Sequence, residues 1–241
     1  MKINAFNQVD EVIKATADFF VACAKEAIAD HDRFSVALSG GNSPKKLHEL
    51  LTSEEYKNQV DWSKVHFFFG DERYVAHDHP DSNYLMAKTT LLDPLNISEA
   101  QVNKVDTSLD PASAAQEYER CICKSFNNNP IFDLILLGLG DDAHTASLFP
   151  HTNLLWIDEE MVKEVYLEDK KVYRISFTAP LINKAKHIVF LTFGANKAHA
   201  MKAVIEGERN IDQYPAQLIK PTNGTLDWFV DEAAISDLTS H

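Results

Sequence analysis

The apolar positions of the chain follow two different periods. From Val9 to Ile28 they recur at helical spacing, which predicts an amphipathic helix near the start of the chain. Later apolar runs are short and continuous, as in strands that are buried on both faces of a sheet. These runs are Phe34 to Leu38, Val65 to Phe69, Leu134 to Leu137, Ile188 to Phe193 and Leu226 to Val230.

Helical patterns lie between these runs. Residues 84–92 and 111–126 are two of them, and Val172 to Phe177 alternates like a further strand after a charged stretch from Asp158 to Lys171. We therefore expect an α/β fold with an open, mostly parallel Rossmann-like sheet and helices on both faces. No repeat, low-complexity run or linker interrupts the pattern, so residues 1–241 are expected to form a single domain.

Polar residues at the predicted helix starts suggest N-caps. Ser43, followed by Pro44, fits the N-cap and first position of the helix after the Phe34–Leu38 strand. Ser82 or Asn83 is expected to cap the helix over 84–92.

Glycine is scarce, and its placement is informative. The chain has 8 glycines, and six of them follow predicted strands directly: Gly40, Gly41, Gly70, Gly138, Gly140 and Gly194. The carboxyl ends of parallel strands lie at one edge of a sheet, where ligands bind in open α/β folds. The glycines therefore predict a shared ligand-binding edge where the backbone comes close to a ligand.

Composition and charge restrict the partners. A net charge of −13 argues against nucleic acid or an anionic membrane surface. Met1 begins a polar segment rather than a signal peptide, and no apolar run approaches the roughly 20 residues of a membrane span. Three cysteines do not suggest a disulfide framework. We therefore expect a cytoplasmic protein.

The strongest candidate for catalysis follows the Leu134–Leu137 strand. There, after two glycines, the chain carries Asp141, Asp142 and His144. Histidine titrates near neutral pH and is the commonest general base, and a nearby carboxylate can orient its ring. His144 is therefore the expected catalytic residue, with Asp142 beside it.

Several features at the same edge predict an anion site. The turn after the first buried strand brings Gly40, Gly41, Asn42 and Ser43 to a helix start, where free N–H groups favour a phosphate. Cations are expected beside this turn, and Asp71 is expected to orient polar groups there; the candidate cations are Arg73, Arg174 and Lys197. Residues 71–73 could instead form a solvated surface turn. Arg174 could instead be an exposed residue of an edge strand.

A metal is not predicted. His77, Asp78, His79 and Asp81 lie close together in sequence, but their spacing matches no common ligand pattern. A loop that leads into the next helix is the simpler interpretation.

An ordered set of motifs resembles that of the 6-phosphogluconolactonases, which are related to the glucosamine-6-phosphate deaminases. The resemblance extends from about Phe34 to the region of Trp228. Its motifs are Ser39-Gly-Gly-Asn-Ser-Pro44, Asp71-Glu-Arg-Tyr-Val75, Ser82-Asn-Tyr84, Gly138-Leu-Gly-Asp-Asp-Ala-His-Thr-Ala-Ser-Leu-Phe-Pro150, Arg174 and Gly194-Ala-Asn-Lys-Ala198.

The resemblance implies hydrolysis of 6-phospho-D-glucono-1,5-lactone to 6-phosphogluconate in the oxidative pentose phosphate pathway, without a metal or other cofactor. His144 would be the general base that activates water, and Asp142 would steady it. Arg73, Arg174 and Lys197 would hold the substrate phosphate. We expect a monomer or a homodimer.

Two residues depart from the family pattern. Ala143 stands where the family usually has glycine, in a turn that calls for positive φ, and alanine there carries a steric cost of about 1 kcal/mol or more. Asn42 replaces a more common serine, which is a mild change.

Two alternatives remain at this point. A glucosamine-6-phosphate deaminase would carry a glutamate five residues after the histidine, where this chain has Phe149. A non-catalytic sugar-phosphate sensor would use the same pocket to control a partner. Turnover of substrate distinguishes the sensor from both enzymes.

Overall fold

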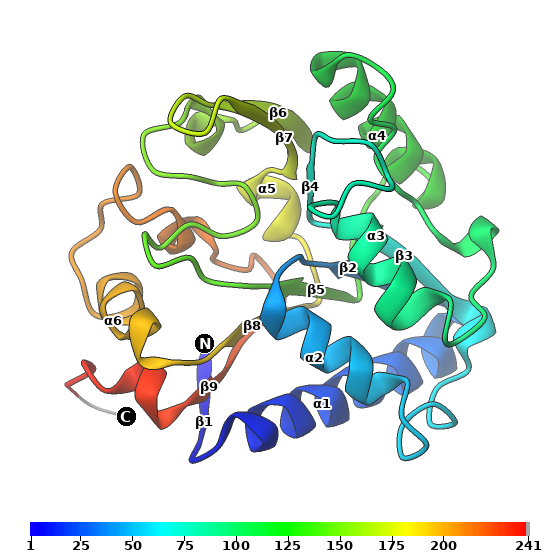
Figure 1. Cartoon of the computed structure of the whole chain (residues 1–241), viewed down its shortest axis with the longest axis horizontal. Coiled ribbons are helices and arrows are strands. Elements are labelled where there is room, and N and C mark those ends of the chain that lie inside the picture. Colours follow the sequence, from blue (N-terminus) through cyan, green and yellow to red (C-terminus); the bar gives the residue numbers. More distant parts are fainter. Residues whose placement is uncertain (240–241) are drawn as a thin grey trace.

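The computed structural model describes residues 1–239, and its centre is a six-stranded sheet (Figure 1). The strand order is β1-β9-β8-β5-β2-β3, and every neighbouring pair is parallel. The strands are β1 (Lys2–Phe6), β2 (Phe34–Leu38), β3 (Val65–Phe69), β5 (Leu134–Leu137), β8 (His187–Thr192) and β9 (Thr225–Asp231). The predicted parallel sheet is therefore confirmed, although β1 had not been expected.

Helices cover both faces of this sheet, as predicted. In β5, Leu134 and Leu136 pack into the core under α1, α2 and α3, whereas Ile135 and Leu137 pack into the core under α4, α5 and α6. Successive strand residues point to opposite faces, so an unbroken apolar run fills both cores. The helices are α1 (Val9–His31), α2 (Asn42–Leu51), α3 (Asn83–Ala87), α4 (Pro111–Ser125), α5 (Ala179–Ile182) and α6 (Ala198–Ile205).

Short helices complete the connections. A π-helix, η2 (Lys88–Leu92), continues α3, and the 3₁₀ helices are η1 (Trp62–Lys64), η3 (Glu99–Gln101), η4 (Asn153–Trp156), η5 (Ala195–Lys197), η6 (Pro215–Leu218) and η7 (Glu232–Ile235). Within residues 1–239, no helix combines the length and the apolar character needed to cross a membrane.

A second, antiparallel sheet was only partly predicted. It consists of β4 (Asp71–Arg73), β7 (Val172–Phe177) and β6 (Val162–Leu167), in the order β4-β7-β6, and lies at the top of the view in Figure 1. β7 was expected, but no strand was predicted at residues 71–73, where ligand-binding side chains were expected, and none was predicted at β6, which lies in a charged stretch. The charges of β6 lie at half-exposed positions while its apolar residues join the core beside α4, so its pattern is too weak to recognise locally.

Of the two predicted N-caps, the one at α3 is confirmed and the one at α2 is wrong. The hydroxyl of Ser82 accepts from the N–H of Leu85 and caps α3. Ser43, by contrast, is not the N-cap of α2. The N-cap is Gly41, whose φ of 106° is open to glycine and costly for other residues, so α2 begins one residue before Ser43.

Candidate functional site

The carboxyl ends of β2, β5 and β8 meet at a cavity of about 380 Å³. β5 lies between the other two strands, so the loops that follow all three form one wall. Eight of the ten predicted site residues line this cavity: Gly40, Gly41, Asn42, Ser43, Asp71, Arg73, His144 and Lys197. The other two contact or neighbour wall residues: Asp142 is bound to His144, and Arg174 lies opposite Arg73 in the small sheet.

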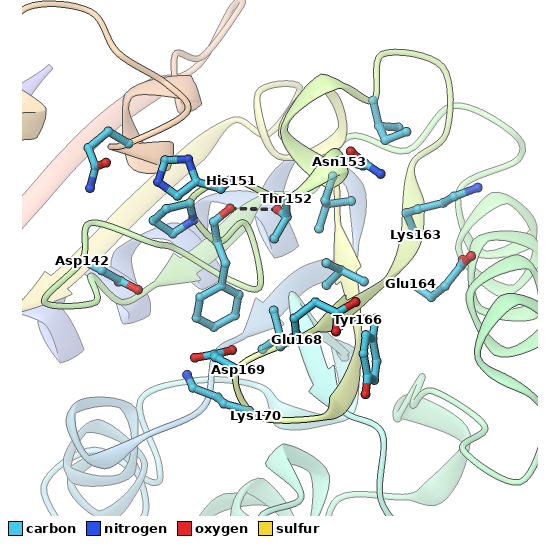
Figure 2. A pocket seen from close by; sticks show the side chains of 17 residues that line it. Asp142, His151, Thr152, Asn153, Lys163, Glu164, Tyr166, Glu168, Asp169 and Lys170 are labelled. Atoms are coloured by element: carbon cyan, nitrogen blue, oxygen red, sulfur yellow. Dashed lines mark hydrogen bonds between the residues drawn. The ribbon is translucent and has the colours of Figure 1, made fainter.

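A larger cavity of about 820 Å³ lies beside the first, between β6 and the segment from Phe149 to Ile157. Figure 2 shows Asp142 at one side of it and charged residues of both signs around the rest, among them Glu164 and Lys170. The smaller cavity is lined by the glycine turns, His144, Arg73 and Lys197, so it is the better candidate site.

His144 and Asp142 form a close pair. His144 Nδ1 lies 2.5 Å from Asp142 Oδ1, and the backbone N–H of His144 donates to the same oxygen at 3.1 Å. Burial by itself would raise the pKa of Asp142, but the hydrogen bonds and charge of His144 outweigh it and lower this pKa to about 2. A carboxylate at Nδ1 accepts a hydrogen bond from the Nδ1–H group. In the neutral ring the proton therefore stays on Nδ1, and Nε2 is the basic nitrogen.

The turn that carries His144 needs a left-handed residue. Ala143 has φ of 61°, as its position in the motif led us to expect, and its side chain is 1% exposed. The N–H of Gly140 donates to the carbonyl of His144 at 2.8 Å, and the N–H of Ala143 donates to the carbonyl of Gly140 at 3.0 Å. These bonds close the turn tightly, which holds alanine in a conformation that glycine would adopt without strain.

Two arginines lie side by side at the small sheet. Arg73 of β4 is directly opposite Arg174 of β7 in the antiparallel register. Burial and then the charge of Arg73 lower the pKa of Arg174. Arg73 lines the cavity and Arg174 does not, so Arg174 adds positive charge from the neighbouring strand without being part of the wall.

A buried carboxylate holds β4 in place. Glu72 is 1% exposed and accepts from the backbone N–H groups of Arg73, Asn83 and Tyr84 at 2.7 to 2.9 Å and from the Ser82 hydroxyl at 3.2 Å. Burial raises the pKa of Glu72, and the backbone hydrogen bonds oppose this shift. This network fixes the backbone on both sides of the carboxylate and therefore the direction of Arg73.

Lys197 has the acidic neighbour that its position calls for. It closes η5 directly before α6, where a lone cation is disfavoured by the helix dipole. Its Nζ lies 2.5 Å from Asp141 Oδ1, and Asn196 Nδ2 donates to the same oxygen at 3.0 Å. Asp141 and Asn196 were not predicted as site residues.

Two buried hydroxyls in the cavity wall were not predicted as site residues. Ser39 follows β2 and Thr192 ends β8, and they are 6% and 2% exposed. Neither hydroxyl has a hydrogen-bond partner in the described part of the chain. A buried hydroxyl without a partner is costly, so both are available to a polar ligand. Their position at strand ends was the one signal that could have identified them.

The acidic and histidine-rich loop makes other contacts. His77 Nε2 lies 2.7 Å from the carbonyl of Val105, and the N–H of Asp81 donates to His79 Nδ1 at 3.1 Å. Over residues 1–239, no group of three or more His, Cys, Asp or Glu side chains is arranged to hold a metal ion.

Comparison with known sequences places the chain among sugar-phosphate enzymes. Residues 7–228 match the family model described as glucosamine-6-phosphate isomerases/6-phosphogluconolactonase. A 6-phosphogluconolactonase of Synechocystis sp. is 44% identical over 218 residues, which is 88% of each protein. One of Nostoc sp. is 40% identical over 233 residues, or 95% of this chain and 94% of the relative.

Known structures agree with the sequence comparison. The 6-phosphogluconolactonase from Trypanosoma cruzi superposes with a TM-score of 0.88 at 28% identity, covering 99% of this chain and 97% of the other. The family model and the relatives extend across nearly the whole chain, including every loop of the cavity wall. The chain therefore belongs to the family of the glucosamine-6-phosphate isomerases and 6-phosphogluconolactonases.

Proposed function

We propose that the protein hydrolyses 6-phospho-D-glucono-1,5-lactone to 6-phospho-D-gluconate, with His144 as the general base. One observation carries the proposal: a histidine whose Nδ1 is bound to a carboxylate lines the same cavity as two cations and an uncapped helix start. A base and a phosphate site in one cavity are what a phosphorylated lactone requires.

The phosphate would lie where positive charge gathers. Arg73 and Lys197 line the cavity, and α2 begins there with no side chain capping its first turn. The N–H groups of Asn42 and Ser43 in that turn favour an anion, and Arg174 adds positive charge beside Arg73. An arriving phosphate would compete with Asp141 for Lys197.

The lactone carbonyl would then lie near His144. Nε2 takes a proton from water as the water oxygen attacks the carbonyl carbon, which forms a tetrahedral oxyanion. When the intermediate collapses, the bond to the ring oxygen breaks and the imidazolium returns its proton to that oxygen. Backbone N–H groups of a glycine turn can stabilise the oxyanion, but not that of Gly140, which already donates to the His144 carbonyl.

The sugar hydroxyls have partners in the wall. Ser39 and Thr192 offer buried hydroxyls, and Asp71 offers a carboxylate whose Oδ2 accepts from Ser147 at 2.7 Å. Asn83 also donates to Asp71, which keeps the carboxylate in one orientation.

The deaminase alternative lacks one part of its relay. Phe149 occupies the position at which the deaminase motif has glutamate, and a phenyl ring carries no proton. The lactonase reaction needs no such group, so this residue favours hydrolysis.

Acid release from freshly made 6-phosphogluconolactone, measured against its spontaneous hydrolysis, tests the proposal. The wild-type protein should exceed the spontaneous rate with and without chelator. His144→Ala should fall to that rate, and Asp142→Asn should lose on the order of 10²-fold in kcat. His187→Gln is the control, because His187 lies at the amino end of β8, away from the cavity.

Two results would count against the proposal. A wild-type rate equal to the spontaneous rate would exclude lactone hydrolysis, and turnover of glucosamine 6-phosphate instead would favour the deaminase. Full activity of His144→Ala would leave hydrolysis standing but remove His144 from its role.

A further inference from the structure

The imidazole of His144 is enclosed by more than its bond to Asp142. One side of the ring lies against the backbone of Gly140. A Cβ atom on Gly140 would be 2.0 Å from Nδ1 and 2.3 Å from Cε1 of His144, far inside van der Waals contact. Any side chain at position 140 would therefore displace the ring, and only glycine allows this close approach.

Phe149 stacks on His144. The two ring centroids are 4.1 Å apart and the planes are inclined by 25°. The backbone of Phe149 is itself held, because the Thr152 hydroxyl donates to its carbonyl at 2.8 Å, the bond drawn as a dashed line in Figure 2. Aromatic pairs of this kind have a preferred geometry in addition to the area they bury.

The Phe149 ring is also covered from outside. Lys170, in the turn between β6 and β7, places its Nζ 4.9 Å from the ring centroid. His144 occupies one face of the ring at 4.1 Å, so the ammonium group lies over the other face. Figure 2 shows Lys170 and Asp142 at the edge of the larger cavity, into whose wall Phe149 also projects.

The geometry points to Phe149 as a positioning residue for His144, a role that rests on the proposed function. The bond to Asp142 fixes one atom of the imidazole but leaves the ring free to turn about that atom. The stacked ring of Phe149, together with the close backbone of Gly140 beside Nδ1 and Cε1, opposes that rotation. Nε2 is thereby kept toward the smaller cavity, in whose wall His144 lies, while Asp142 and Phe149 face the larger one.

Two substitutions distinguish the effect of the aromatic face of Phe149 from the effect of its volume. Phe149→Met keeps most of the apolar volume without an aromatic face, and Phe149→Tyr keeps the face. We expect Phe149→Met to lower kcat by roughly three- to tenfold, the loss of one aromatic stacking contact, with KM within about twofold of wild type. Phe149→Tyr should retain kcat.

A spectroscopic measurement tests the same role without substrate. Nitrogen-15 NMR of the imidazole at alkaline pH reports whether the two ring nitrogens have one environment or exchange between several. The wild type and Phe149→Tyr should show narrow His144 nitrogen signals from one ring orientation, and Phe149→Met should show broadened signals, because the ring then turns about the retained bond to Asp142. His144→Gln identifies the signal.

Phe126→Leu is the matched control. Phe126 is also half-buried against the same core and contacts aromatic neighbours, but it is remote from the cavity wall. It should change neither kcat nor the His144 signal. A Phe149→Met protein with wild-type kcat and His144 nitrogen signals as narrow as those of the wild type would overturn the inference. If the wild type does not hydrolyse the lactone, the proposed function fails, and the NMR comparison still decides the role of Phe149.

Discussion

A buried histidine outside the cavity predicts how stability depends on pH. His48 of α2 is 0% exposed, and its Nδ1 lies 3.0 Å from the Thr90 hydroxyl. That hydroxyl donates to the carbonyl of Met86 at 2.7 Å, so Nδ1 must be the donor to it. Nε2 has no partner among the described residues, and a proton there would have no acceptor. Burial accordingly lowers the pKa of His48 from 6.5 to about 4.

The sign of the effect follows from proton uptake. Between pH 6.5 and 4 the unfolded chain binds a proton at His48 that the folded protein does not, so stability falls as the pH falls. The full difference in pKa corresponds to about 3 kcal/mol, reached below pH 4, and about 2 kcal/mol of it is already lost at pH 5.

Urea unfolding at several pH values between 7.5 and 5 measures this loss. We expect the free energy of unfolding of His48→Leu to fall by about 2 kcal/mol less than that of wild type over this range, because leucine does not titrate. His199→Leu, which removes an exposed histidine from α6, should keep the wild-type dependence. Equal pH dependence in wild type and His48→Leu would refute the reasoning.

Two further substitutions test the turn and the small sheet. Ala143→Gly should change the free energy of unfolding by less than about 1 kcal/mol. Removing the strain of a left-handed alanine stabilises the protein by about 1 to 2 kcal/mol, but the loss of a buried methyl group and the greater freedom of glycine in the unfolded chain offset this gain. A loss above about 2 kcal/mol in urea unfolding would contradict this. Glu72→Gln should cost about 2 to 3 kcal/mol and raise KM for the lactone, because an amide nitrogen cannot accept from the N–H groups that orient Arg73. The half-exposed Glu164→Gln is its control, and equal effects of the two substitutions would argue against a special role of Glu72.

The parallel sheet and the edge that carries the candidate site could be predicted because their signals are local. A continuous apolar run such as Leu134 to Leu137 is recognisable without knowing its neighbours, since both faces of a central strand are buried. Glycines directly after such runs indicated the edge at which the smaller cavity lies, and the His144 turn, with its need for positive φ at Ala143, followed from the motif.

What the sequence did not reveal depends on partners far away in the chain. β6 is a strand because β7 and α4 cover its few apolar residues, and its own charges conceal it. Likewise, the carboxylate beside Lys197 belongs to Asp141, 56 residues earlier in the chain, so their contact could not be predicted locally. In the sequence, Ser39 and Thr192 are ordinary hydroxyl residues at strand ends, and only the fold leaves their hydroxyls buried without a partner. The sequence by itself determined which segments are buried and where the backbone can turn, because these depend on near neighbours. Only the tertiary structure decided which side chains meet across the cavity, because those distances depend on how the whole sheet packs.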